Sequence, residues 1–241
     1  MIGSVCVCSP EELARNHASA VGRGLPWLTA SADRSRPLAI VGGGPSARDS
    51  VGAILSWPGD VLTVNGAYDW LVGLGRTPEW CVLLDPQEAA ADFATRPQDA
   101  TTWLVATMCH PAVFDALRAS PVALWLAPQG DDDISPGSVP GGPTAMTRAP
   151  VLALILGYRE MTLFGADSCY RGEASHAYGG GTVPKDAFWV ESNGRRWLTA
   201  LPMLAQAEYL AELLPSLPGV RLDGDHLASA LLASQSWVLA T

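Results

Sequence analysis

Short apolar runs alternate with amphipathic segments along the chain between residues 37 and 164. The apolar runs are near-continuous, as in strands buried on both faces of a parallel sheet, and lie at Pro37–Val41, Val61–Val64, Trp80–Leu84, Trp103–Ala106, Val122–Leu126 and Met161–Phe164. The helix candidates between them are Ala47–Leu55, Ala67–Leu74, Gln87–Phe93, Pro111–Arg118 and Ala145–Leu156. This alternation predicts an α/β fold, with an open, mostly parallel sheet covered by helices on both faces.

The 241 residues are enough for one large domain, or for one domain with a small appendage. Residues 1–36 are expected to form a helical preamble, because Ser9-Pro10-Glu11-Glu12 combines a serine N-cap, a proline at the first helical position and a glutamate three residues after the cap. Residues 37–241 are expected to form the main domain. A small C-terminal extension should complete it, with a hairpin turning at Asn193-Gly194 and helices at Leu201–Leu214 and His226–Ala233 around a short strand, Val220–Leu222.

Charge and hydropathy exclude two classes of function. The chain has 24 acidic residues against 15 Lys and Arg, of which Lys185 is the one lysine, so the formal net charge is −9. This balance argues against non-specific nucleic-acid binding, which depends on cations that neutralise phosphates. No apolar run approaches the roughly 18–20 residues of a membrane-spanning helix, so no membrane span is expected.

The N-terminal sequence has neither the basic region nor the long apolar region of a secretory signal, and the five cysteines are scattered. This usage is typical of free thiols in a reducing cytosol, so we expect a cytoplasmic protein. Cys6-x-Cys8 is too little for a zinc site, and no metal site is predicted. The tryptophans are expected in core or interface packing, which leaves a homo-oligomer open.

The segment Gly42-Gly43-Gly44-Pro45-Ser46 stands where the first sheet strand turns into a helix. The glycines let the backbone approach a ligand closely, and Ser46 carries both an N–H and a hydroxyl. N–H groups at such a turn favour an anion, typically a phosphate. The segment matches neither GxGxxG nor the P-loop pattern, and a tight turn with no ligand is the alternative.

Polar residues follow the other predicted strands, at the carboxyl edge where open α/β sheets bind ligands. They are Asn65, Asp85, His110 and Asp167. Asp85 and His110 precede prolines and have an alternative role as N-caps, and Asn65 has one as a turn residue. Four such residues on the edge that carries the glycine segment favour a binding site there.

The order of these motifs resembles the MptE-like family, which includes 6-hydroxymethylpterin diphosphokinases and the Maf motility accessory factors. The resemblance is carried by Gly42–Ser46, Val64-Asn65, Leu84-Asp85, Gly141–Thr144 and Leu156–Asp167, and spans roughly Leu38 to Gly224. The same order is similar to bacterial lipooligosaccharide-type sialyltransferases, which bind a CMP-sugar on a Rossmann-like sheet. The resemblance implies a Rossmann-like fold and a nucleotide-activated small-molecule donor.

The resemblance also assigns roles to individual residues. The nucleotide-binding residues that follow from it and from the sheet edge are Gly42, Gly43, Gly44, Pro45, Ser46, Asn65, Asp85, Gly142, Thr144 and Asp167. Gly142 and Thr144 would lie beside the base or ribose, and Asp167 would close the site. The segment Thr144–Arg148 lacks the acidic motif that the resemblance implies for diphosphokinase members, which favours the glycosyltransferase-like branch.

His176 is the best candidate for a general base, because an imidazole with an ordinary pKa near 6.5 can accept a hydroxyl proton at neutral pH. Tyr178 or Tyr170 is expected to stabilise the leaving phosphate, and Arg171 to bind its charge. The alternative is a surface loop in which His176 only hydrogen-bonds nearby backbone.

The leading hypothesis is therefore a nucleotide-dependent transferase that moves a sugar from a nucleotide-sugar donor to an acceptor hydroxyl. One alternative is a pterin-type diphosphokinase that uses ATP and Mg²⁺, and another is a non-catalytic nucleotide-binding or assembly module. No cofactor is assigned, and Mg²⁺ stays open because Asp131-Asp132-Asp133 has a D-x-D spacing. A solvated acidic loop is the favoured interpretation of that segment.

Overall fold

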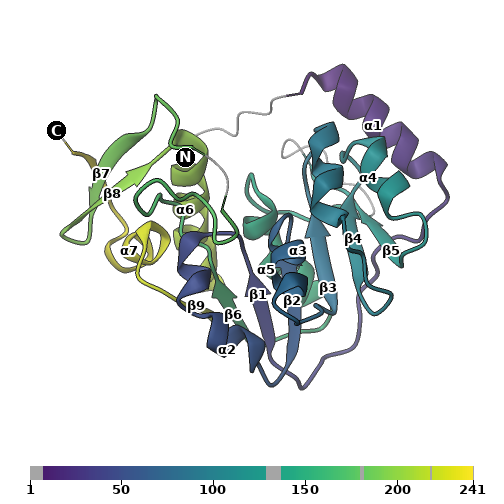
Figure 1. Ribbon diagram of the computed structural model, residues 1–241, viewed down its shortest axis with the longest axis horizontal. Coiled ribbons are helices and arrows are strands. Elements are labelled where there is room, and N and C mark those ends of the chain that lie inside the picture. Colours follow the sequence, from purple (N-terminus) through teal and green to yellow (C-terminus); the bar gives the residue numbers. More distant parts are fainter. Residues whose placement is uncertain (1–7, 129–136, 180–181, 218, 241) are drawn as a thin grey trace.

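The computed structural model describes residues 8–128, 137–179, 182–217 and 219–240. They form a mostly parallel α/β fold with a small antiparallel sheet beside it, which confirms the predicted fold class (Figure 1). The large sheet contains β1 (Leu38–Val41), β2 (Asp60–Val64), β3 (Trp80–Leu83), β4 (Thr102–Ala106), β5 (Val122–Trp125), β6 (Met161–Phe164) and β9 (Val220–Leu222). The helices are α1 (Pro10–Gly22), α2 (Val51–Leu55), α3 (Ala67–Gly73), α4 (Pro111–Ala116), α5 (Ala145–Ile155), α6 (Leu201–Leu213) and α7 (Leu227–Ser234).

The strand order is β5-β4-β3-β2-β1-β6-β9, and every neighbouring pair is parallel. The chain builds outward from β1 to β5, then returns through α5 and adds β6 on the other side of β1. The order therefore reverses between β1 and β6. Open α/β sheets bind ligands in the crevice at such a reversal, outside the carboxyl ends of the strands.

Core side chains cover both faces of this sheet, as the near-continuous apolar runs predicted. Along β1, Leu38 and Ile40 belong to one buried apolar cluster, whereas Ala39 and Val41 belong to another. Successive side chains of a strand point to opposite faces, so the two clusters lie on opposite sides. Helix α5 packs across β1, β2 and β3. Because it runs back against the strands, its first turn lies at their carboxyl ends.

The N-terminal residues pack onto the sheet rather than extending from it. Ser9 caps α1 with the predicted capping box, and the Asn16 side chain donates hydrogen bonds to the carbonyls of Pro86 (3.2 Å) and Met108 (3.0 Å). Further on, Trp27 pairs in parallel with Leu124 at the end of β5. Residues 10–22 therefore cover the carboxyl ends of β3 and β4, on the right of Figure 1.

The C-terminal hairpin forms at the predicted turn. Strands β7 (Phe188–Ser192) and β8 (Arg195–Thr199) pair across Asn193 and Gly194, which both have positive φ. A two-residue strand, β10 (Val238–Leu239), adds to β7. Helix α6 packs against both α7 and α5, which joins this extension to the main sheet. No described helix is long and apolar enough to cross a bilayer.

Two predicted helices are wrong in type. The segment 47–55 is divided into a 3₁₀ turn, η1 (Pro45–Arg48), and the short helix α2, and the segment 87–93 is the 3₁₀ helix η2 (Glu88–Ala94). The first division follows from a tertiary contact that holds Ser46 and from Ser50 and Gly52, which are poor helix formers. In the second segment, Asp85 Oδ1 accepts a hydrogen bond from Gln87 N–H (2.9 Å), and no side chain caps η2. A third 3₁₀ turn, η3 (Leu214–Ser216), ends α6.

The amino ends of three strands meet at one buried tyrosine. Tyr158, fully buried before β6, donates to Asp60 Oδ2 (2.6 Å) at the start of β2 and accepts from Trp80 Nε1 (2.9 Å) at the start of β3. Burial and the Asp60 carboxylate raise the pKa of Tyr158, so the donor stays protonated. This hydroxyl therefore satisfies two buried polar groups at once.

We expect Tyr158→Phe to lower the free energy of unfolding by about 1–3 kcal/mol, because it leaves Asp60 and Trp80 without a buried partner. Chemical denaturation followed by circular dichroism measures the change. Tyr170→Phe is the matched control, since the Tyr170 hydroxyl makes no hydrogen bond to a described residue. Equal stability of the two variants would contradict the assignment.

Candidate functional site

The glycine turn after β1 lies against the exit of β6, on both sides of the strand-order reversal. Gly42 N–H donates to the carbonyl of Phe164 (2.8 Å), and Gly44 N–H donates to that of Gly165 (2.9 Å). Gly165 has a φ of +64°, which turns the chain after β6 back toward the glycines. The two segments that flank the expected ligand crevice are thus joined by backbone hydrogen bonds.

Asp167 fastens the turn through Ser46. Its Oδ1 accepts from the Ser46 N–H (2.9 Å) and its Oδ2 from the Ser46 hydroxyl (2.6 Å). Ser46 is 3% exposed and Asp167 2%, so both hydrogen bonds are shielded from water and assisted by the carboxylate charge. Ser46 was expected to offer these two donors to a phosphate. In this structure the protein's own carboxylate accepts both hydrogen bonds, so a phosphate role for Ser46 stays a prediction and would require this contact to open.

Two of the three glycines are required by the chain's own packing. A Cβ atom on Gly42 would lie within 3.0 Å of the Met146 side chain and of the Gly165 carbonyl oxygen. One on Gly44 would lie within 3.0 Å of Asp167 and of the same oxygen. At these positions the structure agrees with the tight-turn alternative. The contact with Met146 also places the first turn of α5 beside the glycine turn.

Gly43 has a different environment. A Cβ atom there would come to 2.9 Å from His176 Cδ2 and 2.9 Å from the Tyr178 hydroxyl. Between them, Ala177 N–H donates to the Gly43 carbonyl (2.7 Å). The Tyr178 hydroxyl would likewise come to 2.9 Å from a Cβ atom on Gly66, after β2. The loop that carries the predicted catalytic residues therefore covers the carboxyl ends of β1 and β2.

The His176 and Tyr178 rings stack, with centroids 4.9 Å apart and an interplanar angle of 23°. Burial lowers the pKa of His176 below its ordinary value, so the ring is neutral at pH 7. Its Nδ1 lies 2.8 Å from Ser175 Oγ, and Nε2 is the ring atom left for a substrate. Burial raises the pKa of Tyr178 to about 12, so this hydroxyl is a hydrogen-bond donor at neutral pH.

Arg48 also contacts this loop, although the sequence interpretation did not select it. The Arg48 Nε donates to the carbonyl of Ala177, the residue between His176 and Tyr178 in the sequence. The position of Arg48, two residues after Ser46, is the one sequence feature that could have pointed to it. Arg171, the predicted charge clamp, instead pairs with Asp49 on the connection between η1 and α2. The side chains of that pair are 49% and 66% exposed, so a clamp role requires a weak surface ion pair to open.

The start of α5 is built by Thr144, Gly142 and Arg148. Thr144 is the N-cap and forms a capping box with Thr147. The Arg148 guanidinium, 6% exposed, donates to the carbonyls of Gly142 (3.0 Å), Val139 and Pro128 (3.1 Å), which holds the incoming segment. Gly142 packs directly on the Tyr209 ring of α6, where a Cβ atom would come to 2.6 Å.

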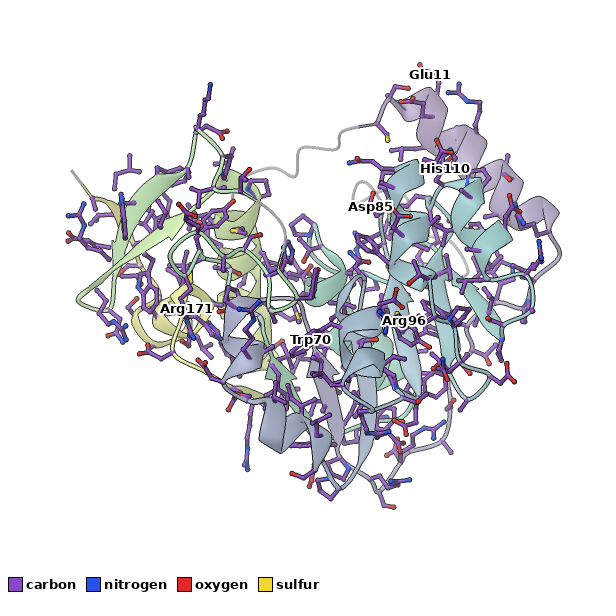
Figure 2. The ribbon with its side chains drawn as sticks, in the orientation of Figure 1. Glu11, Trp70, Asp85, Arg96, His110 and Arg171 are labelled. Carbon is purple, nitrogen blue, oxygen red and sulfur yellow. The ribbon has the colours of Figure 1, made fainter. Side chains whose placement is uncertain are left out.

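The remaining edge residues have structural partners. Asn65 has a φ of +46°, and its Oδ1 accepts from Leu84 N–H (3.2 Å), which joins the exits of β2 and β3. His110 is the N-cap of α4, as its alternative role predicted. Figure 2 shows Asp85 and His110 close together beside α1 and far from Arg171. The structure thus gathers the glycine turn, Asp167, His176, Tyr178 and the start of α5, whereas Asp85 lies apart from them beside α1 and Arg171 is paired with Asp49 directly after η1.

Among residues 8–128, 137–179, 182–217 and 219–240, no group of three His, Cys, Asp or Glu side chains could hold a metal ion. Asp131-Asp132-Asp133 and Cys6 lie outside the described residues. Cys109 and Cys169 are buried, and burial raises the pKa of each thiol to about 12. Neither is therefore a thiolate nucleophile at neutral pH.

Residues 11–173, more than half of the chain, match the family described as 6-hydroxymethylpterin diphosphokinase MptE-like. A Maf glycosyltransferase from Magnetospirillum magneticum AMB-1 is similar in fold, with a TM-score of 0.64 and 19% identity over 89% of this chain and 38% of that chain. The chain thus spans well under half of that protein.

A mammalian sialyltransferase in complex with Gal-beta-1-3GalNAc-ortho-nitrophenol also matches, over 92% of this chain and 90% of that chain. Its TM-score is 0.44 and its sequence identity is 9%. Comparison with curated protein sequences gave no match.

Ser46→Ala is expected to lower the free energy of unfolding by about 1–3 kcal/mol, because it removes a buried, charge-assisted hydrogen bond from Asp167. Ser56→Ala serves as the control, since the exposed Ser56 hydroxyl bonds only a carbonyl of its own helix. Urea denaturation of the two variants measures the difference. A Ser46 variant as stable as the control would exclude the proposed role of this contact.

Proposed function

The chain belongs to the MptE-like family, as its motif order predicted, and on that premise we propose that it is a nucleotide-dependent transferase of the glycosyltransferase-like type. It would bind a nucleotide-sugar donor along the carboxyl edge of the sheet and transfer the sugar to an acceptor hydroxyl. The observation that supports this most is the neutral His176, stacked on Tyr178 and seated over Gly43 at the strand-order reversal.

His176 is suited to general-base catalysis. Its neutral imidazole takes the proton of the acceptor hydroxyl while the acceptor oxygen forms a bond to the anomeric carbon of the donor. The bond from that carbon to the phosphate oxygen breaks, and the nucleotide leaves with the electron pair. Tyr178 donates a hydrogen bond to the departing phosphate, since its hydroxyl is protonated at neutral pH.

The charge of the departing phosphate needs a cation, and Arg48 is better placed for this than Arg171. Arg48 already contacts the loop between His176 and Tyr178, whereas Arg171 is paired with Asp49. The planar guanidinium can bind two phosphate oxygens at once. Glycosyl transfer also agrees with the activity named for the Maf glycosyltransferase from Magnetospirillum magneticum AMB-1, which shares the fold.

A diphosphokinase is the second candidate, because the matching family is described by 6-hydroxymethylpterin diphosphokinase. It would move a diphosphate from ATP to a hydroxymethyl group and would require Mg²⁺. The helix start Thr144–Arg148 has no acidic side chain to hold the metal, which favours the glycosyltransferase-like proposal. A non-catalytic nucleotide-binding module would bind nucleotide without turnover of any donor.

Thermal-shift measurements with CMP, CDP, UDP, GDP and ATP, each with and without Mg²⁺, separate these candidates. We expect a cytidine or uridine nucleotide to stabilise the protein without metal, by roughly 2.7 kcal/mol at about 100 times its Kd. Strict dependence on ATP and Mg²⁺ would support the diphosphokinase instead. No response to any nucleotide would contradict the proposal.

His176→Ala is expected to lower kcat by about 10²- to 10⁴-fold, the usual contribution of a general base. The wild-type rate should be constant at neutral pH and fall on acidification through a pKa below 6.5, because burial lowers the pKa of His176 and only the neutral ring accepts a proton. Steady-state kinetics from pH 5 to 8 measures both effects.

His110→Asn is the matched histidine control, since asparagine also caps helices and α4 should be preserved. Its pH profile should equal that of the wild type. Near-wild-type turnover of His176→Ala at saturating donor and acceptor would remove this residue from the mechanism.

A further inference from the structure

A cavity of about 420 Å³ lies in the C-terminal part of the structure. It is bounded by α6 and α7, which lie side by side in Figure 1, and by the segment that leads into β10. The residues that line it are Glu208, Ala211, Glu212, Leu231, Gln235, Ser236 and Trp237. Its volume falls within the roughly 300–1,000 Å³ of small-molecule sites.

This cavity lies on the opposite side of α6 from the candidate site. Gln206 lies on the side of the candidate site, where its Oε1 accepts from the Thr144 hydroxyl (2.8 Å) and its Nε2 donates to Ser168 Oγ (2.9 Å). Glu208 follows Gln206 by two residues, and two residues rotate a helix by about 200°. A ligand in the cavity would therefore be separate from the donor and the acceptor of the proposed function.

The Glu208 carboxylate has one oxygen without a partner. Trp237 Nε1 donates to its Oε1 (2.9 Å), whereas its Oε2 is shielded from water and receives no hydrogen bond from a described residue. A buried carboxylate oxygen without a donor is costly, and native structures rarely contain one. Because Glu208 lines the cavity, a donor bound there would lie beside this carboxylate.

The side chains around the cavity offer acceptors and negative charge. Glu212 follows Glu208 by about one helical turn, and neither carboxylate forms an ion pair with a residue that the structure describes. Gln235 Nε2 donates to main-chain carbonyls of α6 (3.4 Å) and α7 (3.0 Å), which leaves its Oε1 as an acceptor. No Lys or Arg is among the described residues of the lining.

We propose that this cavity binds a small organic cation through a primary ammonium group. An ammonium has three N–H donors and no acceptor, which suits two carboxylates and an amide oxygen that come from different elements. The donors of a guanidinium lie in one plane and suit this arrangement less. The Trp237 ring provides an aromatic wall for the cation and its alkyl chain.

A metal ion is the weaker candidate for the same place. Among the residues that the structure describes, no group of three His, Cys, Asp or Glu side chains could hold one. The cavity is also lined by apolar side chains of α6 and α7, which suit the carbon atoms of an amine. The site is thus built for an organic molecule, and the inference does not depend on the proposed function.

The probe for the test is butylamine, which is an ammonium ion at pH 7. Neutral 1-butanol and tetramethylammonium, a cation without N–H donors, are the comparison ligands. ¹H–¹⁵N NMR titration follows the Trp237 indole N–H, assigned with Trp237→Phe, and the amides of Gln235 and Ser236. We expect butylamine to shift these signals and to bind at least about tenfold more tightly than either comparison ligand, because only it combines charge with donors.

Glu208→Gln keeps the shape of the side chain and an acceptor for Trp237 but removes the charge. We expect this variant to bind butylamine about tenfold more weakly. Glu212→Gln should weaken binding only about twofold to threefold, because water screens the exposed Glu212 carboxylate. The matched control is Glu160→Gln, which removes an exposed carboxylate directly before β6 and should leave the affinity unchanged. Thermal unfolding verifies that each variant is folded.

Three results would overturn the inference. They are unchanged Trp237, Gln235 and Ser236 signals at millimolar butylamine, equal affinity of the wild type for butylamine and 1-butanol, and wild-type affinity in Glu208→Gln. Tighter binding of methylguanidine than of butylamine would overturn the choice of an ammonium group. None of these measurements involves a nucleotide, so the proposed function is tested separately by the thermal-shift experiment.

Discussion

The Asp167 carboxylate, buried against Ser46, is the contact on which the rest of the site depends. It holds the glycine turn of β1 to the exit of β6, the place where the strand order reverses. Gly42 and Gly44 follow from it, because a turn drawn this close to Gly165 and Asp167 has no room for a side chain. A buried carboxylate is costly unless its oxygens are hydrogen-bonded, and the two donors of Ser46 meet that requirement.

An acidic chain with one lysine has no broad positive field with which to attract phosphates. Its polar groups are instead distributed among internal partners: Ser46 to Asp167, Thr144 to Gln206 and Arg171 to Asp49. The groups that the proposed function uses are the neutral His176, the protonated Tyr178 and the Arg48 guanidinium. A single local arginine would then have to bind the phosphate charge that the chain as a whole does not attract.

The sequence predicted the sheet well because strands buried on both faces appear as short, continuous apolar runs, which can be recognised locally. All six apolar runs between residues 37 and 164 became strands, and the capping signals at Ser9 and the hairpin turn at Asn193-Gly194 formed as expected. The 3₁₀ turns were missed because the Ser46 contact with a residue 121 positions away decides one of them. Likewise, nothing local to Arg171 indicates Asp49, and no motif marks Gln206. Hydrogen-bond and ion-pair partners that are distant in sequence cannot be predicted from the local pattern of residues.

Some residues of the candidate site lie inside the segment that matches the family, and others lie after it. The match ends at residue 173, whereas His176, Tyr178 and Gln206 all lie beyond it, in the loop after β6 and on α6. The matched residues therefore supply β1 to β6, the glycine turn and Asp167, whereas the proposed catalytic side chains follow them in the chain. A change confined to the segment after residue 173 would thus alter the proposed chemistry while leaving these six strands in place.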